Sequence, residues 1–569
     1  MNVRLLKTVT PLFAALWLLT GCGEKIVEGD APPAAGLAEA EALLGLEFTP
    51  RERALMREDL AEQRAAFLAL RARTPANDVA PPLVFDPRPA GFRPTVPDRP
   101  PRWRETAAPP RPADLEDLAF ATVGELSALL RSRRVTSLEL TELFLGRLQR
   151  LGPELACVVS LTPEIAREQA RRADREIAAG RWRGPLHGVP YGVKDLLAVR
   201  GTRTTWGAEP YRDQTLDETA TVVAKLEAAG AVLCAKLTLG ALAMGDQWFG
   251  GQTRNPWDLE QGSSGSSAGP ASAVAAGLLP FAIGSETWGS IVSPSMRCGT
   301  TGLRPTFGRV SRAGAMALSW SMDKLGPMAR CAEDCALVFE TIRGADGRDP
   351  SVIEAPFPYA PRADLRGLRV GFAPAAFDTA GDREDPGLAR DRAALAALRG
   401  LGAELVPVEL PRTDAMPLSV ILTAEAAAAF EELTLSGRDD LLSQQGRGDW
   451  PNIFRAARLI PAVEYLQANR LRAQLMAEVD RMFAGIDLYV GPSFAGQDLL
   501  VFNLTGHPSV VAPDGFDGEG HPRAWCFVGR LFDEATLLAA AGAWQEATGW
   551  HRAHPPRYAA ASSGAASAR

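Results

Sequence analysis

The stretch from Gly262 to Pro305 constrains the fold more than any other part of the chain. It reads GSSGSSAGPASAVAAGLLPFAIGSETWGSIVSPSMRCGTTGLRP. A Gly/Ser loop precedes an alanine-rich run that predicts a helix over residues 271–279, followed by a short strand over 280–283 and a second loop ending at Ser290. Such composition alone would also suit a flexible linker, but a linker would not alternate with buried-looking elements. We therefore expect two serine-bearing loops on either side of one rigid unit, which can hold a nucleophile near its proton-transfer partner.

Two serines in these loops carry a resemblance to a known family. Ser266 follows a glycine in the first loop, and Ser290 closes the second loop 24 positions later. In this pattern the stretch resembles the amidase signature family, although GSSAGP stands where the family usually shows GSSGGS. The resemblance implies that Ser290 is the nucleophile and that Ser266 is a bridging serine that follows a cis Gly265–Ser266 peptide bond.

The second loop departs from the family pattern at several positions. The resemblance implies an oxyanion hole built from the backbone N–H groups of Thr287, Trp288, Gly289 and Ser290. Trp288 stands where many relatives have glycine, Val292 where many have arginine, and Glu286 replaces a frequent aspartate. Because a bulky residue avoids positive φ, Trp288 can hold this loop only at negative φ. Glu286 is expected to tie the loop down.

A lysine ends a second characteristic run. Residues 189–195 read VPYGVKD, which predicts a strand that delivers Lys194 at its end and resembles the family's GxPxxVKD element. The resemblance implies that Lys194 is the catalytic base, although a lysine can also simply close a strand edge. Lys236, at the end of a predicted strand over 231–236, is its rival, but it matches a basic family position that does not carry the proton. Asp195 is expected to be a structural neighbour.

The chemistry requires a base for the serine. A serine hydroxyl is a poor nucleophile at neutral pH and needs a base within hydrogen-bond reach. No histidine lies in a recognisable site motif, so a lysine must serve, and burial must lower its pKa enough to leave it neutral. By resemblance, Lys194 takes the proton of Ser290 through Ser266 and returns it to the leaving amine, and water releases the acyl-enzyme. The HxxH pair His551/His554 has no acidic neighbour and reads as a surface pair. As an amide hydrolase of this kind, the chain is expected to need no metal or cofactor.

Other serine hydrolases remain possible. Residues 265–269 match GxSxG, which would make Ser267 the elbow serine of an α/β-hydrolase with His507 or His521 as its base. A strand should run directly into such an elbow, whereas residues 255–258 are turn-like.

Residues 321–327 offer a further alternative. They resemble the family's SxDxxGP turn beneath the site, but Ser321 and Lys324 also form the SxxK pair of penicillin-binding proteins and β-lactamases. No KTG or SDN partner follows. A catalytically inactive relative that serves as an envelope binding or scaffold protein also stays open.

The N-terminus has the features of a lipoprotein signal peptide. Arg4 and Lys7 precede an apolar run over residues 9–19, which is short for a membrane span. The run ends in Leu-Thr-Gly-Cys, and small residues before Cys22 look like a bacterial lipobox. We expect a signal peptide over residues 1–21, lipidation of Cys22 and an extracytoplasmic location, tethered by the lipid. The alternative is a buried cysteine near an ordinary cleavage site.

The remaining chain suggests an α/β body behind an accessory segment. Residues 22–113 contain a helix pattern over 51–73 and a proline-dense run over 81–112, which could be a strap on the body or a spacer to the membrane. We expect an amidase signature domain over 114–555 and a disordered tail over 556–569.

Helix and strand patterns within the body support this fold class. Apolar periodicity predicts helices over residues 123–133, 137–150 and 163–179, and residues 220–244 read as helix, strand and helix. The resemblance implies the amidase signature fold, a central mixed β-sheet covered by helices on both faces.

The charge of the chain limits its partners. A net charge of −7 and a pI near 5.6 argue against nucleic acid, since no basic excess exists to meet phosphates. The expected partner is a small-molecule or peptide amide, with aryl amides, peptide C-terminal amides and fatty-acid amides all open. The glutamyl-tRNA amidotransferase subunit shares the motifs but is cytoplasmic and works with partner subunits, so the predicted lipid anchor disfavours that role.

Overall fold

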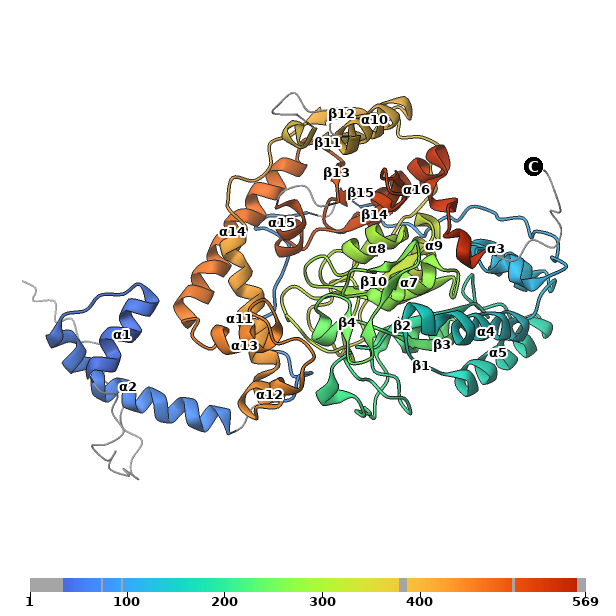
Figure 1. The fold of residues 1–569 in the computed structure, drawn as a ribbon. Helices are drawn as coiled ribbons and strands as arrows, with labels where there is room; N and C mark the ends of the chain where they lie inside the picture. The colour runs from blue at the N-terminus through green and yellow to red at the C-terminus, as the bar shows by residue number, and fades with distance from the viewer. Residues whose placement is uncertain (1–33, 73–74, 94–95, 378–385, 494–496, 560–569) are drawn as a thin grey trace, which may run out of the picture. The chain divides into compact units, whose positions relative to one another are not determined.

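A computed structural model describes residues 34–72, 75–93, 96–377, 386–493 and 497–559 (Figure 1). The chain divides into two units, Met1–Pro75 and Ala76–Arg569. The predicted signal peptide, Cys22 and residues 560–569 lie outside the described residues.

The first unit contains two helices, α1 (Ala34–Leu44) and α2 (Pro50–Arg71). Thr49 begins α2 with a capping box, in which its hydroxyl accepts from the N–H of Glu52 and the Glu52 carboxylate accepts from the N–H of Thr49. This reciprocal pair satisfies two donors that the helix start would otherwise leave unpaired. The helix predicted over residues 51–73 is therefore present.

A mixed sheet of eleven strands forms the centre of the second unit. Across the sheet its strands are β1 (Val158–Leu161), β3 (Val232–Leu237), β2 (Pro190–Lys194), β8 (Phe281–Glu286), β10 (Lys324–Ala329), β9 (Thr301–Arg304), β14 (Ser509–Phe516), β15 (Pro522–Gly529), β13 (Leu488–Pro492), β11 (Arg369–Phe372) and β12 (Glu404–Pro407). β2 runs parallel to both of its neighbours, and so does β11, while the remaining neighbours are antiparallel.

Helices pack on this sheet in two groups. The first group is α4 (Ser137–Leu155), α5 (Pro163–Ala178), α7 (Ala268–Ala275) and α8 (Val292–Cys298). The second group is α6 (Thr221–Ala228), α9 (Ala332–Ile342) and α16 (Glu534–Thr548). α7 contacts α4 and α8, α9 contacts α6 and α16, and both α7 and α9 pack on β10 (Figure 1). This layered arrangement confirms the predicted α/β fold class.

Further helices extend the body beyond these two groups (Figure 1). They are α3 (Val123–Arg131), α10 (Pro386–Gly400), α11 (Val420–Ala429), α12 (Glu431–Leu435), α13 (Trp450–Ala457), α14 (Ala462–Phe483) and α15 (Asp498–Leu504). The predicted helices over 123–133, 137–150 and 163–179 correspond to α3, α4 and α5, because each has an apolar stripe that the core buries.

Two predicted segments differ in the structure. The turn predicted over residues 321–327 is largely strand β10, which lies between β8 and β9. Proline lacks an N–H donor and usually avoids central strands, yet Pro327 pairs opposite Ile283 because β10 follows β8 over its whole length. The helix predicted after β3 is a loop with a short 3₁₀ turn, in which Leu242 and Ala243 have positive φ.

Residues 76–93, which include the start of the proline-dense segment, contact other parts of the second unit. Asn77 Nδ2 donates to the carbonyl of Ala317 at 2.9 Å, and Asn77 Oδ1 accepts from the N–H of Ala317 at 2.8 Å. The guanidinium of Arg472 lies over the Phe85 ring, 3.5 Å from its centroid. Of the strap and the spacer that the sequence left open, these contacts correspond to a strap, and residues 76–93 are called the strap below.

The C-terminal end of the body is ordered further than predicted. Residues 556–558 form a 3₁₀ turn, and the side chain of Tyr558 is 1% exposed. The Tyr558 carbonyl accepts a hydrogen bond from Arg147 Nη2 at 2.8 Å. A disordered tail starting at residue 556 is therefore wrong for these three residues. Within the described ranges, no helix is both long and apolar enough to cross a bilayer.

Candidate active site

Strand β2 carries Lys194 to the edge of the sheet where the Gly/Ser loop lies. β2 and β8 are parallel, with Val193 opposite Ile283, so their carboxyl ends meet at one edge. Lys194 is the last residue of β2 and is fully buried. Its Nζ lies 2.8 Å from Ser266 Oγ and 2.9 Å from Ser285 Oγ.

The two serines predicted for catalysis lie within hydrogen-bond distance of each other. Ser266 Oγ is 2.9 Å from Ser290 Oγ, and the Gly265–Ser266 peptide bond is cis, as the resemblance implies. A Cβ on Gly265 would lie 1.8 Å from the carbonyl oxygen of Gly245, so only glycine fits where these two loops meet. The fold thus brings Lys194, Ser266 and Ser290 into one hydrogen-bonded chain.

The environment of Lys194 favours its neutral form. Burial lowers the pKa of Lys194 to about 7, although the nearby carboxylates of Asp323 and Glu286 oppose this shift. The groups that bond its Nζ are serine oxygens, including Ser267 Oγ at 3.2 Å. No carboxylate of the described residues lies within ion-pair distance of Nζ, so the amine can act as a base near neutral pH.

Glu286 ties down the loop that leads to Ser290. Its Oε2 accepts hydrogen bonds from the N–H groups of Ile291 and Val292 at 2.8 and 2.9 Å. Its Oε1 lies 2.7 Å from Arg304 Nη1 and accepts from Asn503 Nδ2 at 2.9 Å. Burial alone would raise the pKa of Glu286, but Arg304 and the backbone donors lower it to about 2. The predicted tethering role of Glu286 is therefore confirmed.

The predicted oxyanion loop contains backbone N–H groups that make no hydrogen bond to the described residues. Among the described residues, no acceptor takes a hydrogen bond from the N–H groups of Trp288, Gly289 or Ser290. Thr287 Oγ1 donates to Asp323 Oδ1 at 2.5 Å, which anchors the start of the loop. Gly289 supplies the positive φ of +88°, whereas Trp288 avoids positive φ and is 37% exposed. Trp288 thus replaces a glycine without taking a strained backbone angle.

Val292 contacts apolar side chains where many relatives carry arginine. It packs with Val511, Ala524 and Cys526 in a small buried cluster. This position, two residues after the predicted nucleophile, therefore contributes packing to α8 and no positive charge to the loop.

The elbow serine of the alternative hydrolase has no histidine beside it. Ser267 Oγ donates to the carbonyl of Ser285 at 3.0 Å. His507 Nδ1 lies 2.8 Å from Thr505 Oγ1, and burial lowers the pKa of His507 to about 3. His521 lies within ion-pair distance of the carboxylates of Asp258 and Asp517. The strand before this loop, β7 (Asp258–Gly262), belongs to a separate two-stranded sheet with β6 (Arg254–Asn255).

Ser321 and Lys324, the two residues of the alternative SxxK pair, have different surroundings. Ser321 Oγ donates to Glu425 Oε1 at 2.8 Å and accepts from Arg472 Nη1 at 2.9 Å. Lys324 is buried in β10, and its Nζ has no hydrogen-bond partner among the described residues. The two side chains share no hydrogen bond, so they do not form a nucleophile–base pair here.

The rival lysine is held in an ion pair. Lys236 Nζ lies 2.7 Å from Asp195 Oδ1, and both side chains are fully buried. Asp195 Oδ2 also accepts from the N–H of Thr205 at 2.8 Å. Asp195 therefore has the structural role that the sequence predicts.

Sequence reasoning missed Ser285, which contacts Lys194 through both its hydroxyl and its carbonyl. The only signal for it is a polar residue near the end of the otherwise apolar strand FAIGSE, directly before Glu286. It also missed Arg304 and Asn503, because their contacts with Glu286 connect distant parts of the chain.

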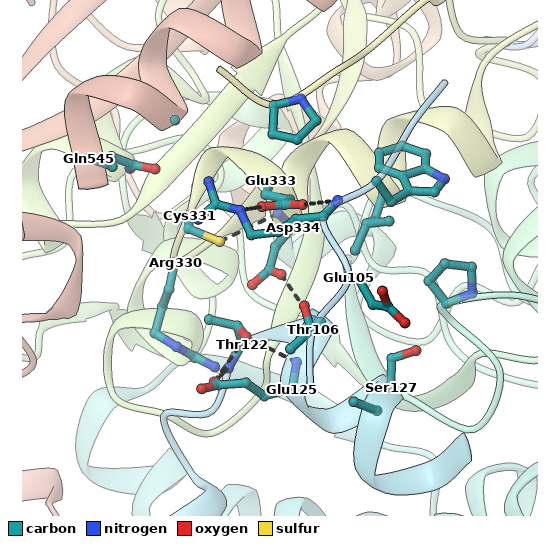
Figure 2. A pocket seen from close by; sticks show the side chains of 18 of the residues that line it. Glu105, Thr106, Thr122, Glu125, Ser127, Arg330, Cys331, Glu333, Asp334 and Gln545 are labelled. Carbon is teal, nitrogen blue, oxygen red and sulfur yellow. Dashed lines mark hydrogen bonds and ion pairs between the residues drawn. The ribbon is translucent and has the colours of Figure 1, made fainter. Parts of the chain in front are cut away.

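Two cavities help to place the site. One of about 270 Å³ reaches Ser285 and Thr287, beside the residues described above. Another, of about 790 Å³, is shown in Figure 2; among its labelled groups, Thr122 bonds to Glu125 and the N–H of Asp334 donates to Cys331 Sγ, while the Asp334 carboxylate caps α3 by accepting from the N–H of Val123. His551 lines this second cavity and is buried, so the prediction of a surface histidine pair is wrong for that residue. No group of three or more metal-binding side chains occurs in the described part of the chain.

Comparisons with known proteins identify the family of this chain. A family model described as Amidase matches residues 139–499. The chain is 37% identical over 479 residues to a glutamyl-tRNA(Gln) amidotransferase subunit from Roseiflexus castenholzii, covering 76% of this chain and 97% of that protein. The corresponding subunit from Methylococcus capsulatus is 36% identical over 484 residues, with 76% and 98% covered.

Solved structures with the same architecture include a peptide amidase. The native peptide amidase from Stenotrophomonas maltophilia has 31% sequence identity and a TM-score of 0.68, covering 78% of this chain and 99% of that one. A bacterial aryl acylamidase superposes with a TM-score of 0.67 at 23% identity over 76% of this chain and 98% of that one, which shows a common fold.

Proposed function

The chain belongs to the amidase signature family, and on that premise we propose that it hydrolyses the C–N bond of a carboxamide through an acyl-enzyme on Ser290. The observation that carries this proposal is the hydrogen-bonded chain from Lys194 through Ser266 to Ser290, with separations of 2.8 and 2.9 Å. Linear amides outside the peptide backbone are the proposed substrates.

Lys194 is the proposed base in its neutral form. Ser290 transfers its hydroxyl proton to Ser266 Oγ as Ser266 passes its own proton to Lys194 Nζ, and Ser290 Oγ bonds to the carbonyl carbon. When the tetrahedral intermediate collapses, the C–N bond breaks and the same relay returns a proton to the departing nitrogen. Water then attacks the acyl ester through this relay and releases the carboxylate.

The backbone N–H groups of the loop are the proposed oxyanion hole. The unpaired donors of Trp288, Gly289 and Ser290 would stabilise the negative charge that develops on the carbonyl oxygen, together with the N–H of Thr287. Losing one donor of this kind typically lowers the rate by about 10²–10³. The anchoring of Glu286 and Thr287 would keep these donors fixed before substrate arrives.

A serine trap tests the assignment directly. The purified chain is treated with a fluorophosphonate, and the modified peptide is mapped by mass spectrometry. We expect the adduct on Ser290 in the wild type and in a Lys225→Ala control, and a loss of labelling in Lys194→Ala. An adduct on Ser267 or Ser321 would overturn the mechanism in favour of the elbow or SxxK chemistry. Absence of both labelling and amide turnover would favour an inactive envelope protein.

A glutaminase that supplies ammonia to partner subunits is the second candidate, because a relative at 37% identity carries the amidotransferase name. The substrates that the purified chain turns over distinguish these two functions. An amidase hydrolyses peptide C-terminal or aryl amides on its own, whereas an amidotransferase subunit would hydrolyse glutamine and depend on its partners.

We also propose that the chain is an extracytoplasmic lipoprotein attached to a membrane through Cys22. The charged start, the apolar run and the small residues before this cysteine support it. Metabolic labelling with a fatty-acid analogue should mark the wild type and fail in Cys22→Ser, which should move to the soluble fraction. Equal labelling and equal fractionation of the two would contradict the anchor.

A further inference from the structure

The cavity of about 270 Å³ has its inner end beside the proposed catalytic residues. Ser285 and Thr287 line that end. Ser285 Oγ lies 2.9 Å from Lys194 Nζ, and Thr287 begins the oxyanion loop. Apolar side chains, among them Leu196, Leu318 and Leu325, also line the cavity. A hollow that combines apolar side chains with polar groups next to a reactive centre can serve as a substrate pocket.

The strap supplies one wall of this cavity. Asp78 and Ala80 line it, although they lie outside the matched family region of residues 139–499. Asn77 fixes this wall through the reciprocal hydrogen bonds with Ala317, and it also donates to the carbonyl of Ala429 at 3.2 Å. The strap is therefore a built part of the pocket that other family members need not share.

The charged side chains along the cavity have an acidic excess. Its two guanidiniums are already paired, since Arg312 Nε lies 2.9 Å from Asp349 Oδ2 and Arg348 Nη2 lies 2.7 Å from Glu218 Oε2. Asp78 has no ion-pair partner among the described residues. Asp323 adds a further carboxyl group at the inner end, although burial raises its pKa. The cavity therefore has no unpaired positive group to offset the carboxylate of Asp78.

We propose that this pocket selects amide substrates that carry a cationic group, and that Asp78 on the strap is a specificity-determining residue. The proposal rests on the amidase function above and deepens it by naming the substrate class. A guanidinium or ammonium group at the mouth would meet the Asp78 carboxylate, while its apolar stem would lie along the leucines. Because Asp78 is exposed, water screens the attraction, and we expect about a fivefold preference.

Matched probes isolate this single charge. N-acetyl-L-argininamide and N-acetyl-L-citrullinamide differ only in the charge of the acyl part, and N-acetylagmatine and N-acetyl-N′-carbamoylputrescine differ only in the charge of the leaving amine. Each pair is tested twice, by kcat/KM on the wild type and by calorimetric binding to Ser290→Ala. Asp78→Asn and Asp78→Lys are the test variants, and Asp98→Asn, a second exposed carboxylate of the N-terminal segment, is the matched control.

The expected result is a preference of about fivefold for the cationic member of at least one pair. This preference should fall to about one in Asp78→Asn, reverse in Asp78→Lys and persist in Asp98→Asn. Equal binding of both members of both pairs, or a preference unchanged in Asp78→Asn, would overturn the proposal. A charge preference in binding without any turnover would support the pocket and contradict the amidase function, so the two failures are distinct.

Discussion

The carboxyl ends of two neighbouring strands each hold a buried lysine, yet the two sites have opposite electrostatics. At the end of β3, Lys236 Nζ lies 2.7 Å from a carboxylate oxygen of Asp195. At the end of β2, Lys194 Nζ contacts the hydroxyls of Ser266 and Ser285 at 2.8 and 2.9 Å. Asp195 directly follows Lys194 in the chain but pairs with the other lysine.

The direct partners of the two amines decide which lysine can act as a base. Burial lowers the pKa of both amines, and in each case nearby carboxylates oppose that shift. For Lys236 the carboxylate is in direct contact and holds the charged form as a buried ion pair. For Lys194 the direct partners are neutral hydroxyls, so the uncharged amine is accessible. One lysine should thus matter for stability and the other for turnover.

The largest expected effect is on turnover in Lys194→Met. Removing the base should lower kcat/KM by about 10²–10⁴, the usual contribution of general base catalysis. Methionine fills similar space, leaves no buried charge behind and removes a group whose lowered pKa opposes folding near neutral pH, so the thermal midpoint should not fall. Amide hydrolysis and circular dichroism of the same preparations check both parts. Retention of more than a tenth of the activity would remove Lys194 from the mechanism.

The reciprocal substitution, Lys236→Met, should act on stability. It leaves Asp195 buried without its ion pair, which typically costs about 3–5 kcal/mol of unfolding free energy. Denaturant unfolding measures this loss, and Lys236→Met combined with Asp195→Asn should recover part of it. The folded fraction should keep most of its kcat/KM. A stable but inactive Lys236→Met would break the contrast between the two lysines.

The part of this contrast that the sequence could predict is local. The run VPYGVKD predicts β2 and the position of Lys194 at its end, and the family motifs identify Ser266 and Ser290. Apolar residues at three- and four-residue intervals also predict α3, α4 and α5. What the sequence could not predict is the choice of partner for Asp195, because strand register and side-chain direction decide whether its carboxylate faces Lys194 or Lys236.

Non-local contacts account for the other differences. Strand β10 contains Gly326 and Pro327, which favour a turn by composition, and its pairing with β8 and β9 makes it a strand. The strap contacts residues more than 200 positions away, as Asn77 does with Ala317. Proline-rich composition shows that such a segment cannot fold alone, but it does not show which surface covers it.

The pH dependence of activity should sharpen the role of Lys194. With a pKa of about 7, the amine is protonated at lower pH, so kcat/KM should fall about tenfold per pH unit below that value. Linkage gives a second signature, because the unfolded chain binds a proton at this lysine up to about pH 10.4, whereas the folded chain releases it near 7.

The free energy of unfolding should therefore rise with pH across this window. Lys236 and Lys324 contribute slopes of the same sign, since burial lowers their pKa values too. The measurement is accordingly the difference between the wild type and Lys194→Met, whose slope should be smaller. Identical slopes, or an acid limb of kcat/KM far from pH 7, would contradict a neutral Lys194.

The smallest expected effect is that of substituting Ser285. Its hydroxyl is one of the neutral groups that contact Lys194 where Lys236 has a carboxylate. Its hydroxyl accepts a hydrogen bond from the charged form of Lys194 at 2.9 Å. Ser285→Ala removes one partner that favours the ammonium, so the pKa of Lys194 should fall further and the acid limb of kcat/KM should move to lower pH. Because Ser266 still positions the amine, kcat at alkaline pH should drop only about two- to fivefold, the value of roughly one neutral hydrogen bond.

A pH profile of Ser285→Ala measures this shift, and Ser436→Ala, which changes a serine at the end of a distant helix, is the control. Movement of the acid limb to higher pH would mean that Ser285 instead stabilises the neutral amine. The hydroxyl partners of Lys194 and the carboxylate partner of Lys236 would then not differ in the way argued above.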